Sequence, residues 1–119
     1  MKTSDAFLDK YDVTLFVTDT PVYFDISASF DEGGKLTISK GNKDDDWYLH
    51  ISKGETPALK RVLDKTCKPR IHTGDANADT LAMLKAQFGG ERDAFENILK
   101  FLDNRGVKYT QSHWIGSDQ

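Results

Sequence analysis

Alternating hydrophobic and polar positions dominate the first half of the chain. Between residues 22 and 30 every second side chain is apolar, namely Val22, Phe24, Ile26, Ala28 and Phe30. This period of two predicts a half-buried β-strand. Shorter alternating runs predict strands around residues 13–17, 36–38 and 47–51, and the first of them is expected to place Val13, Leu15 and Val17 on one face. Turn sequences at 19–21 and 31–34 and a polar loop at 41–46 separate the runs, which favours an antiparallel meander.

The period changes in the second half. Apolar residues at helical spacing predict three helices, the first opening at Thr56-Pro57, the second carrying Leu81, Leu84 and Phe88, and the third ending at 104–106. Either Asp75 or Asn77 could cap the second helix, which is expected to stop at the glycines 89–90. Residues 107–115 alternate again. We therefore predict an α+β fold for residues 1–119 as a single domain, with an antiparallel four- to five-stranded sheet, made of an N-terminal meander plus a C-terminal strand, and about three helices on one face.

Composition supports a packed, disulfide-free domain. Of the 119 residues, 38% are hydrophobic and 11% aromatic, which is typical of a globular core rather than a disordered chain. The single cysteine, Cys67, rules out an internal disulfide and a cysteine-based zinc site. No stretch approaches the roughly 20 apolar residues of a membrane span, and the first residues do not resemble a signal peptide. These features predict a cytoplasmic protein without a membrane segment, metal or cofactor.

Charge is unevenly distributed along the sequence. Residues 1–52 contain ten acids and five bases, whereas residues 53–70 contain two acids and six bases. The net charge is −3. An acidic front half beside one basic segment favours a protein that recognises a charged partner.

No arrangement of residues predicts an active site. The three histidines, His50, His72 and His113, could come together with Asp25 or Asp75 as metal ligands or as acid–base groups. Their spacing, however, does not place two ligands on one helix or strand, and the loop His72–Asp75 is better interpreted as a turn followed by a helix cap. The glycine pairs lack the spacing of a phosphate-binding loop. We therefore expect a binding protein rather than an enzyme.

The strongest candidate for a binding surface is acidic and aromatic. Three successive aspartates precede Trp47 and Tyr48, and carboxylates beside aromatic rings can steer and then hold a cationic partner. Taken alone, this acidic run is slightly better explained as a charged loop that keeps a hairpin soluble, and it is the acidic front half of the chain that favours a binding surface. The residues expected to contact a partner are Asp25, Asp44, Asp45, Asp46, Tyr23 and Tyr48.

A second hypothesis concerns nucleic acid. Arg61, Lys65 and Lys68 would share one helix face that could follow phosphates, and Tyr23 and Tyr48 could stack on bases of a single strand. The sequence pI near 5.5 favours a solvated basic helix instead. Nucleic acid is the less favoured partner.

Residues 23–39, the ending Gly106-Val107-Lys108-Tyr109 and the pair Trp114-Ile115 together resemble small bacterial immunity proteins of contact-dependent and other polymorphic toxin systems. This resemblance implies a cytoplasmic inhibitor that binds and neutralises one cognate toxin domain. It transfers no functional residue, because the matching segments are a hairpin, a helix end and a strand. If the toxin is a nuclease, an acidic surface would suit its cationic active site.

Overall fold

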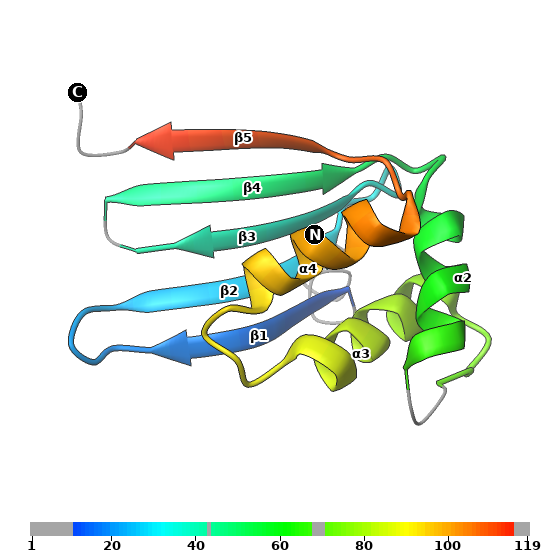
Figure 1. The fold of residues 1–119 in the computed structure, drawn as a ribbon, viewed down its shortest axis with the longest axis horizontal. Coiled ribbons are helices and arrows are strands. Elements are labelled where there is room, and N and C mark those ends of the chain that lie inside the picture. The colour runs from blue at the N-terminus through cyan, green and yellow to red at the C-terminus, as the bar shows by residue number, and fades with distance from the viewer. Residues whose placement is uncertain (1–10, 43, 68–70, 116–119) are drawn as a thin grey trace, which may run out of the picture.

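The computed structural model describes residues 11–42, 44–67 and 71–115. Four strands are followed by three helices and a last strand. In chain order these are β1 (Asp12–Thr18), β2 (Phe24–Phe30), β3 (Leu36–Gly41), β4 (Asp45–Ile51), α2 (Thr56–Thr66), α3 (Ala76–Phe88), α4 (Ala94–Arg105) and β5 (Thr110–Ile115). The strands form one antiparallel sheet in the order β1-β2-β3-β4-β5, as the alternation predicted (Figure 1).

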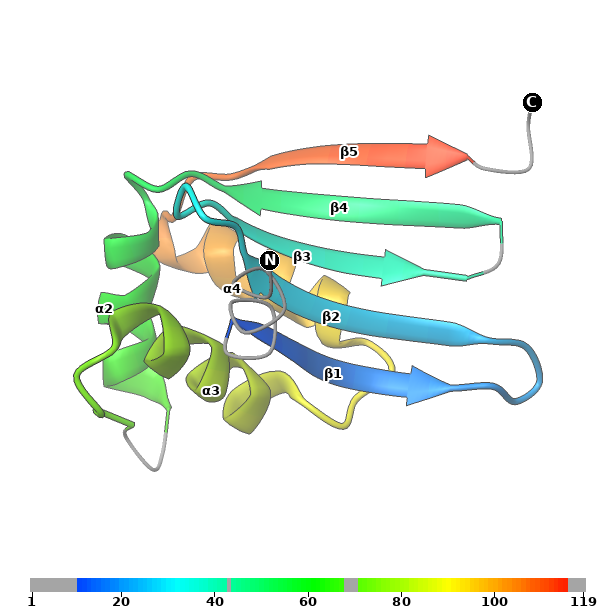
Figure 2. The same ribbon diagram turned by 180° about the vertical axis from the view of Figure 1, so that it is seen from behind.

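The three helices pack on one face of this sheet. α4 crosses in front of β2 and β3 in Figure 1 and behind them in Figure 2, while α2 lies beside one end of the sheet. The predicted α+β class is therefore confirmed. We call the opposite face, which no described helix covers, the open face.

Alternation along the strands builds the core between the two layers. On β2, Ile26, Ala28 and Phe30 are buried, and on β3 Leu36 and Ile38 are fully buried against the helices. The helices contribute their apolar stripes to the same cluster, including Leu59, Leu63, Leu84, Ile98 and Leu102. Burying these side chains is the main stabilising contribution to a domain of this size.

β1 departs from the predicted pattern. Its register with β2 shifts between Thr14 and Phe16, so Val13 is paired with Ala28 and Phe16 with Ile26. This bulge turns Val17 away from the core, and 56% of its surface is exposed. The expectation that Val13, Leu15 and Val17 share one face is therefore wrong, because an extra residue in the strand reverses the alternation after Leu15.

The ends of the helices follow from local sequence. Asp75 caps α3 by accepting a hydrogen bond from the Ala78 N–H, whereas Glu55, not Thr56, is the residue at the N-cap of α2. Gly106 ends α4 with a φ of 72°, a left-handed conformation that glycine adopts without strain. The Lys68-Pro69 stop predicted for the first helix lies outside the described residues.

Candidate functional site

The β3–β4 turn is tighter than the sequence suggested. β3 continues to Gly41 and β4 begins at Asp45, so two of the predicted loop aspartates belong to a strand. The side chain of Asn42 closes the turn, since its Oδ1 accepts hydrogen bonds from the N–H groups of Asp44 and Asp45, both at 2.8 Å. The polar loop predicted over 41–46 is therefore corrected to a short turn that carries the ladder up to Asp45.

Placing the aspartates in a strand separates them by face. Asp46 shares the open face with Tyr48, because Leu49, between Tyr48 and His50, is buried on the helix side. Asp45 lies on the helix side, where its Oδ1 is 3.5 Å from Nε2 of His113. The His113 ring stacks on Trp47 with centroids 4.7 Å apart. Asp45 is thus the one predicted contact residue that faces away from the other strand residues of the set.

The remaining predicted contact residues come together at one end of the open face. In the sheet register Asp25 is paired with Gly41, and Gly41 is paired with Asp46. The glycine leaves space between the two aspartates, since a Cβ at residue 41 would lie 2.0 Å from Oδ1 of Asp46. We call this group the acidic end. It consists of Tyr23, Asp25, Asp44, Asp46 and Tyr48.

A neighbouring carboxylate contributes to the raised pKa of each tyrosine of the acidic end. The Tyr23 hydroxyl donates to Oδ2 of Asp25 at 2.7 Å, and this hydrogen bond, followed by burial and the charge of Asp25, raises the pKa of Tyr23. Burial, and then the charge of Asp46, raises the pKa of Tyr48. Within the described part of the chain none of Asp25, Asp44 and Asp46 forms an ion pair. The acidic end therefore carries negative charge available to a partner.

Apolar side chains that sequence reasoning missed surround these carboxylates. Val22, which the alternation placed in one strand with Phe24, instead precedes β2 and is 60% exposed, and Trp114, paired with Asp46, is 58% exposed. A hollow of about 280 Å³ is lined by Tyr23 of the acidic end together with Val17, Thr18 and Asp19. Exposed apolar groups next to charged ones are typical of protein interfaces. The bulge in β1 exposes Val17 and the register of β5 places Trp114 beside Asp46, and neither could be predicted from alternation.

The histidines do not converge. His50 lies on the open face, with Nδ1 3.3 Å from Oγ1 of Thr37 and Nε2 3.0 Å from Oγ of Ser112. His113 is on the opposite face and His72 is exposed in the loop before α3. Across the described ranges no group of three or more His, Cys, Asp or Glu side chains is arranged to hold a metal ion.

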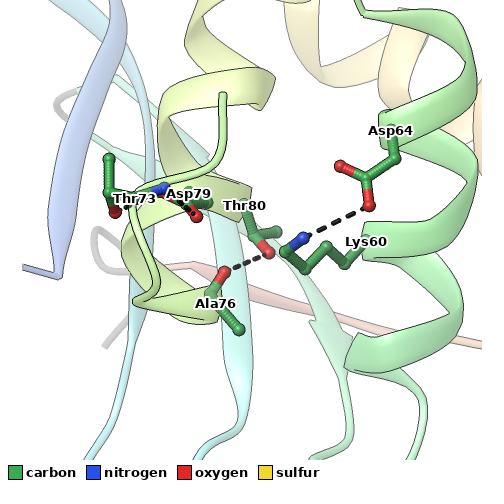
Figure 3. Close-up of polar contacts among 6 residues, drawn as sticks. All are labelled: Lys60, Asp64, Thr73, Ala76, Asp79 and Thr80. Carbon is green, nitrogen blue, oxygen red and sulfur yellow. Dashed lines mark hydrogen bonds and ion pairs between the residues drawn. The ribbon is translucent and has the colours of Figure 1, made fainter. Parts of the chain in front are cut away.

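A second hollow of about 280 Å³ lies between α2 and α3, and Figure 3 shows the polar contacts beside it. It is lined in part by Lys60 and Asp64 of α2, whose Nζ and Oδ2 are 3.2 Å apart, and by Thr80 of α3, which donates to the carbonyl of Ala76. Beside it Asp79 accepts hydrogen bonds from the N–H and the hydroxyl of Thr73, at 2.8 and 2.6 Å. These bonds hold the loop before α3 in place. The loop His72–Asp75 thus anchors and caps a helix, in line with its predicted structural role.

The described part of the basic segment, residues 53–67, does not form a second charged surface on the sheet. Lys60 is paired with Asp64, and Arg61 and Lys65 are exposed on α2, in the helical layer. Lys68 and Arg70 lie outside the described residues. Cys67 is buried in the core, and burial, followed by the charge of Asp64, raises its pKa. The thiol therefore lacks the lowered pKa of a reactive cysteine.

The chain matches no protein-family model, no curated protein and no solved structure. No helix of the described ranges is long and apolar enough to span a membrane.

Proposed function

We propose that this chain is an immunity-type binding protein that neutralises a cognate toxin domain in the cytoplasm by covering a cationic surface with its acidic end. The observation that carries the proposal is the placement of Asp25 and Asp46 on either side of Gly41, on one face and without an ion pair in the described chain. Uncompensated carboxylates on a protein surface attract a cationic partner and accelerate its association.

Side chains next to the two aspartates would add contact area to the electrostatic attraction. Tyr23 and Trp114 are exposed, rigid rings on either side of the two aspartates, and residues of this kind often dominate binding energy. The hollow beside Tyr23 could accept one apolar side chain of the partner. A toxin whose active site holds phosphate groups fits this surface, because such a site presents arginine and lysine to any acidic ligand.

The fold offers less support for a single-stranded nucleic acid. Tyr48 and His50 stack on the open face with ring centroids 6.0 Å apart, yet the same face carries Asp25 and Asp46, which would repel phosphates. The basic residues of α2 belong to the helical layer. Nucleic-acid binding stays an alternative prediction, and a fluorescence titration with short oligonucleotides at low salt would detect it.

Co-expression with the toxin domain expected from the adjacent gene tests the proposal. Cells that make the toxin and this chain should grow, and the double variant Asp25→Lys, Asp46→Lys should lose protection. Glu32→Lys is the matched control, because it reverses an exposed acid at the opposite end of the sheet. If the wild-type chain gives no protection, the proposed function is wrong. If the double variant protects as well as Glu32→Lys, the acidic end is not the binding surface.

Binding kinetics give an independent measurement. The double variant should lower the association rate constant by about tenfold or more at low ionic strength, since steering by charge changes association rates over a range of about 10 to 1,000. The difference should shrink in high salt. The dissociation rate constant should change more when Tyr23 or Trp114 is replaced by alanine, because these side chains contribute contact area.

A further inference from the structure

A hollow lies at the end of the open face opposite the acidic end, and two lysines line it. Its volume is about 340 Å³, and besides Tyr109 it is lined by Lys35, His50, Ser52, Glu55, Lys108 and Thr110. The strand ends that contribute these residues, the start of β3, the end of β4 and the start of β5, meet beside α2 in Figure 1. We call this hollow the lysine hollow.

The sheet register gathers polar groups between the two lysines. Leu49 and Ile51 are buried on the helix side, so His50 and Ser52 face the open side. Thr110 is paired with His50 and shares its face. Because β4 lies between β3 and β5, these groups lie between the strands that the two lysines precede. The hydroxyls of Ser52 and Thr110 form no hydrogen bond within the described residues.

The positive charge of the lysine hollow is only partly balanced. Neither Lys35 nor Lys108 forms an ion pair within the described ranges. Glu55 is the one acid among the described lining residues, and its Oε1 accepts a hydrogen bond from the backbone N–H of Lys108 at 3.2 Å. The Tyr109 hydroxyl is occupied as well, since it donates to Oδ1 of Asp103 at 2.6 Å. Two ammonium groups and one carboxylate leave one positive charge in the hollow when His50 is neutral.

His50 responds to this positive charge. Burial, and then the charge of Lys35, lowers the pKa of His50. The two ring nitrogens lie beside the hydroxyl oxygens of Thr37 and Ser112, and a hydroxyl oxygen can accept a hydrogen bond from either N–H of a protonated ring. An anion in the hollow would therefore offset the repulsion from Lys35 while both contacts of the ring are kept.

We propose that the lysine hollow binds a phosphate group, either as free phosphate or as the monoester group of a small molecule. Lysine is a common phosphate ligand, and the hydroxyls of Ser52 and Thr110 add donors for the further oxygens of a tetrahedral anion. The volume falls within the range of about 300–1,000 Å³ typical of small-molecule sites, which leaves room for the organic part of a monoester. Because both lysines are exposed, water weakens their attraction, and inorganic phosphate should bind with a Kd of about 1 mM.

Titration of the full chain with inorganic phosphate at constant ionic strength, followed by amide NMR, tests the proposal. The signals of the lining residues should shift and saturate. Lys35→Gln and Lys108→Gln should each weaken binding about fivefold, because each removes one surface charge contact. Lys65→Gln removes the same charge from an exposed position of α2 and is the matched control. Shifts that stay linear in phosphate concentration, or an equal loss in Lys65→Gln, would overturn the proposal.

Two further arms define the site and its ligand. Glu55→Gln should tighten phosphate binding about threefold, because the amide oxygen can still accept from the Lys108 N–H but no longer repels the anion. Weaker binding by this variant would contradict the proposal. Glycerol 3-phosphate distinguishes the two sources of the group. Tighter binding than inorganic phosphate would assign the hollow to a monoester, and weaker binding would assign it to free phosphate.

The titration of His50 gives a readout that non-specific binding would not move. Sulfate is a suitable tetrahedral probe, because it keeps both charges over the pH range in which histidine titrates. Compared with sodium chloride at equal ionic strength, sulfate should raise the pKa of His50, measured by NMR of the ring protons, more than that of His72 or His113. Equal changes at the three rings would overturn the proposal. Neither experiment involves a toxin or the acidic end, so failure here would leave the proposed function to its own test.

Discussion

Asp25 and Asp46 flank Gly41 on the open face, each paired with it in the sheet register. Because residue 41 has no side chain, carboxylates can lie on both of the strands that flank β3, namely Asp25 on β2 and Asp46 on β4. Any side chain at position 41 would meet Oδ1 of Asp46. The shape of the acidic end therefore depends on a residue that contributes no chemistry of its own.

Replacing Gly41 with alanine should separate binding from stability. The new Cβ would force the Asp46 carboxylate to move, whereas alanine costs less conformational entropy than glycine in a strand. We expect the free energy of unfolding, measured by urea denaturation, to change by less than about 1 kcal/mol, while the association rate with the toxin domain falls. Gly33→Ala is the control, because its Cβ would meet Asp31 at an ordinary 3.4 Å. Equal association rates for the two variants would contradict the prediction.

The hydrogen bond between Tyr23 and Asp25 should be visible in the titration of the tyrosine. Because this bond and the charge of Asp25 raise the Tyr23 pKa, Asp25→Asn should lower that pKa toward its ordinary value of 10.0. NMR titration of the tyrosine ring carbons measures the change for each ring. Tyr109, whose pKa is raised by its own hydrogen bond to Asp103, serves as the internal control and should not move.

The sheet was predictable from the sequence because its strands alternate and its loops are short. The alternation of residues 22–30 placed Asp25 opposite the core, and the structure agrees. The bulge in β1 was not predictable, since Val13, Leu15 and Val17 alternate equally well in a regular strand. Period alone does not reveal an extra residue, and the exposure of Val17 follows from it.

The acidic end was only half predictable for a related reason. Its residues were chosen by composition, but their grouping depends on register, which pairs Gly41 with both aspartates. The aspartate run indicated a loop, whereas the Asn42 side chain closes a tighter turn and puts Asp45 in a strand. An asparagine after a glycine was a usable signal for that turn.

Lys40 should contribute to stability by joining the sheet to α4. Its ammonium group pairs with Glu96 and lies 5.0 Å from the ring centroid of Trp47 and 5.3 Å from that of Phe95. Lys40→Met keeps the aliphatic stem but removes these interactions, so we expect a loss of about 1 kcal/mol in the free energy of unfolding. Lys85→Met, at an exposed position of α3, should change it little. A similar effect of the two substitutions in urea denaturation would contradict the prediction.

Asp79 should make stability fall at acid pH. Hydrogen bonds from the Thr73 hydroxyl, and then from the Thr73 and Gly74 N–H groups, lower the pKa of this carboxyl below its ordinary value of 3.8, although burial opposes them. A lowered pKa in the folded state means that the stabilising contribution is complete above the unfolded-state pKa and is lost as the pH falls through the folded-state pKa. Asp79→Asn should therefore cost about 2 kcal/mol near neutral pH, because an amide nitrogen cannot accept from Thr73. The difference from wild type should shrink below about pH 4.

Asp93→Asn, at the start of α4 where no side-chain cap bond forms, is the control. Thermal denaturation of the three proteins between neutral and acid pH measures this, and a difference that stays constant down to acid pH would show that the Asp79 charge is not what stabilises the loop.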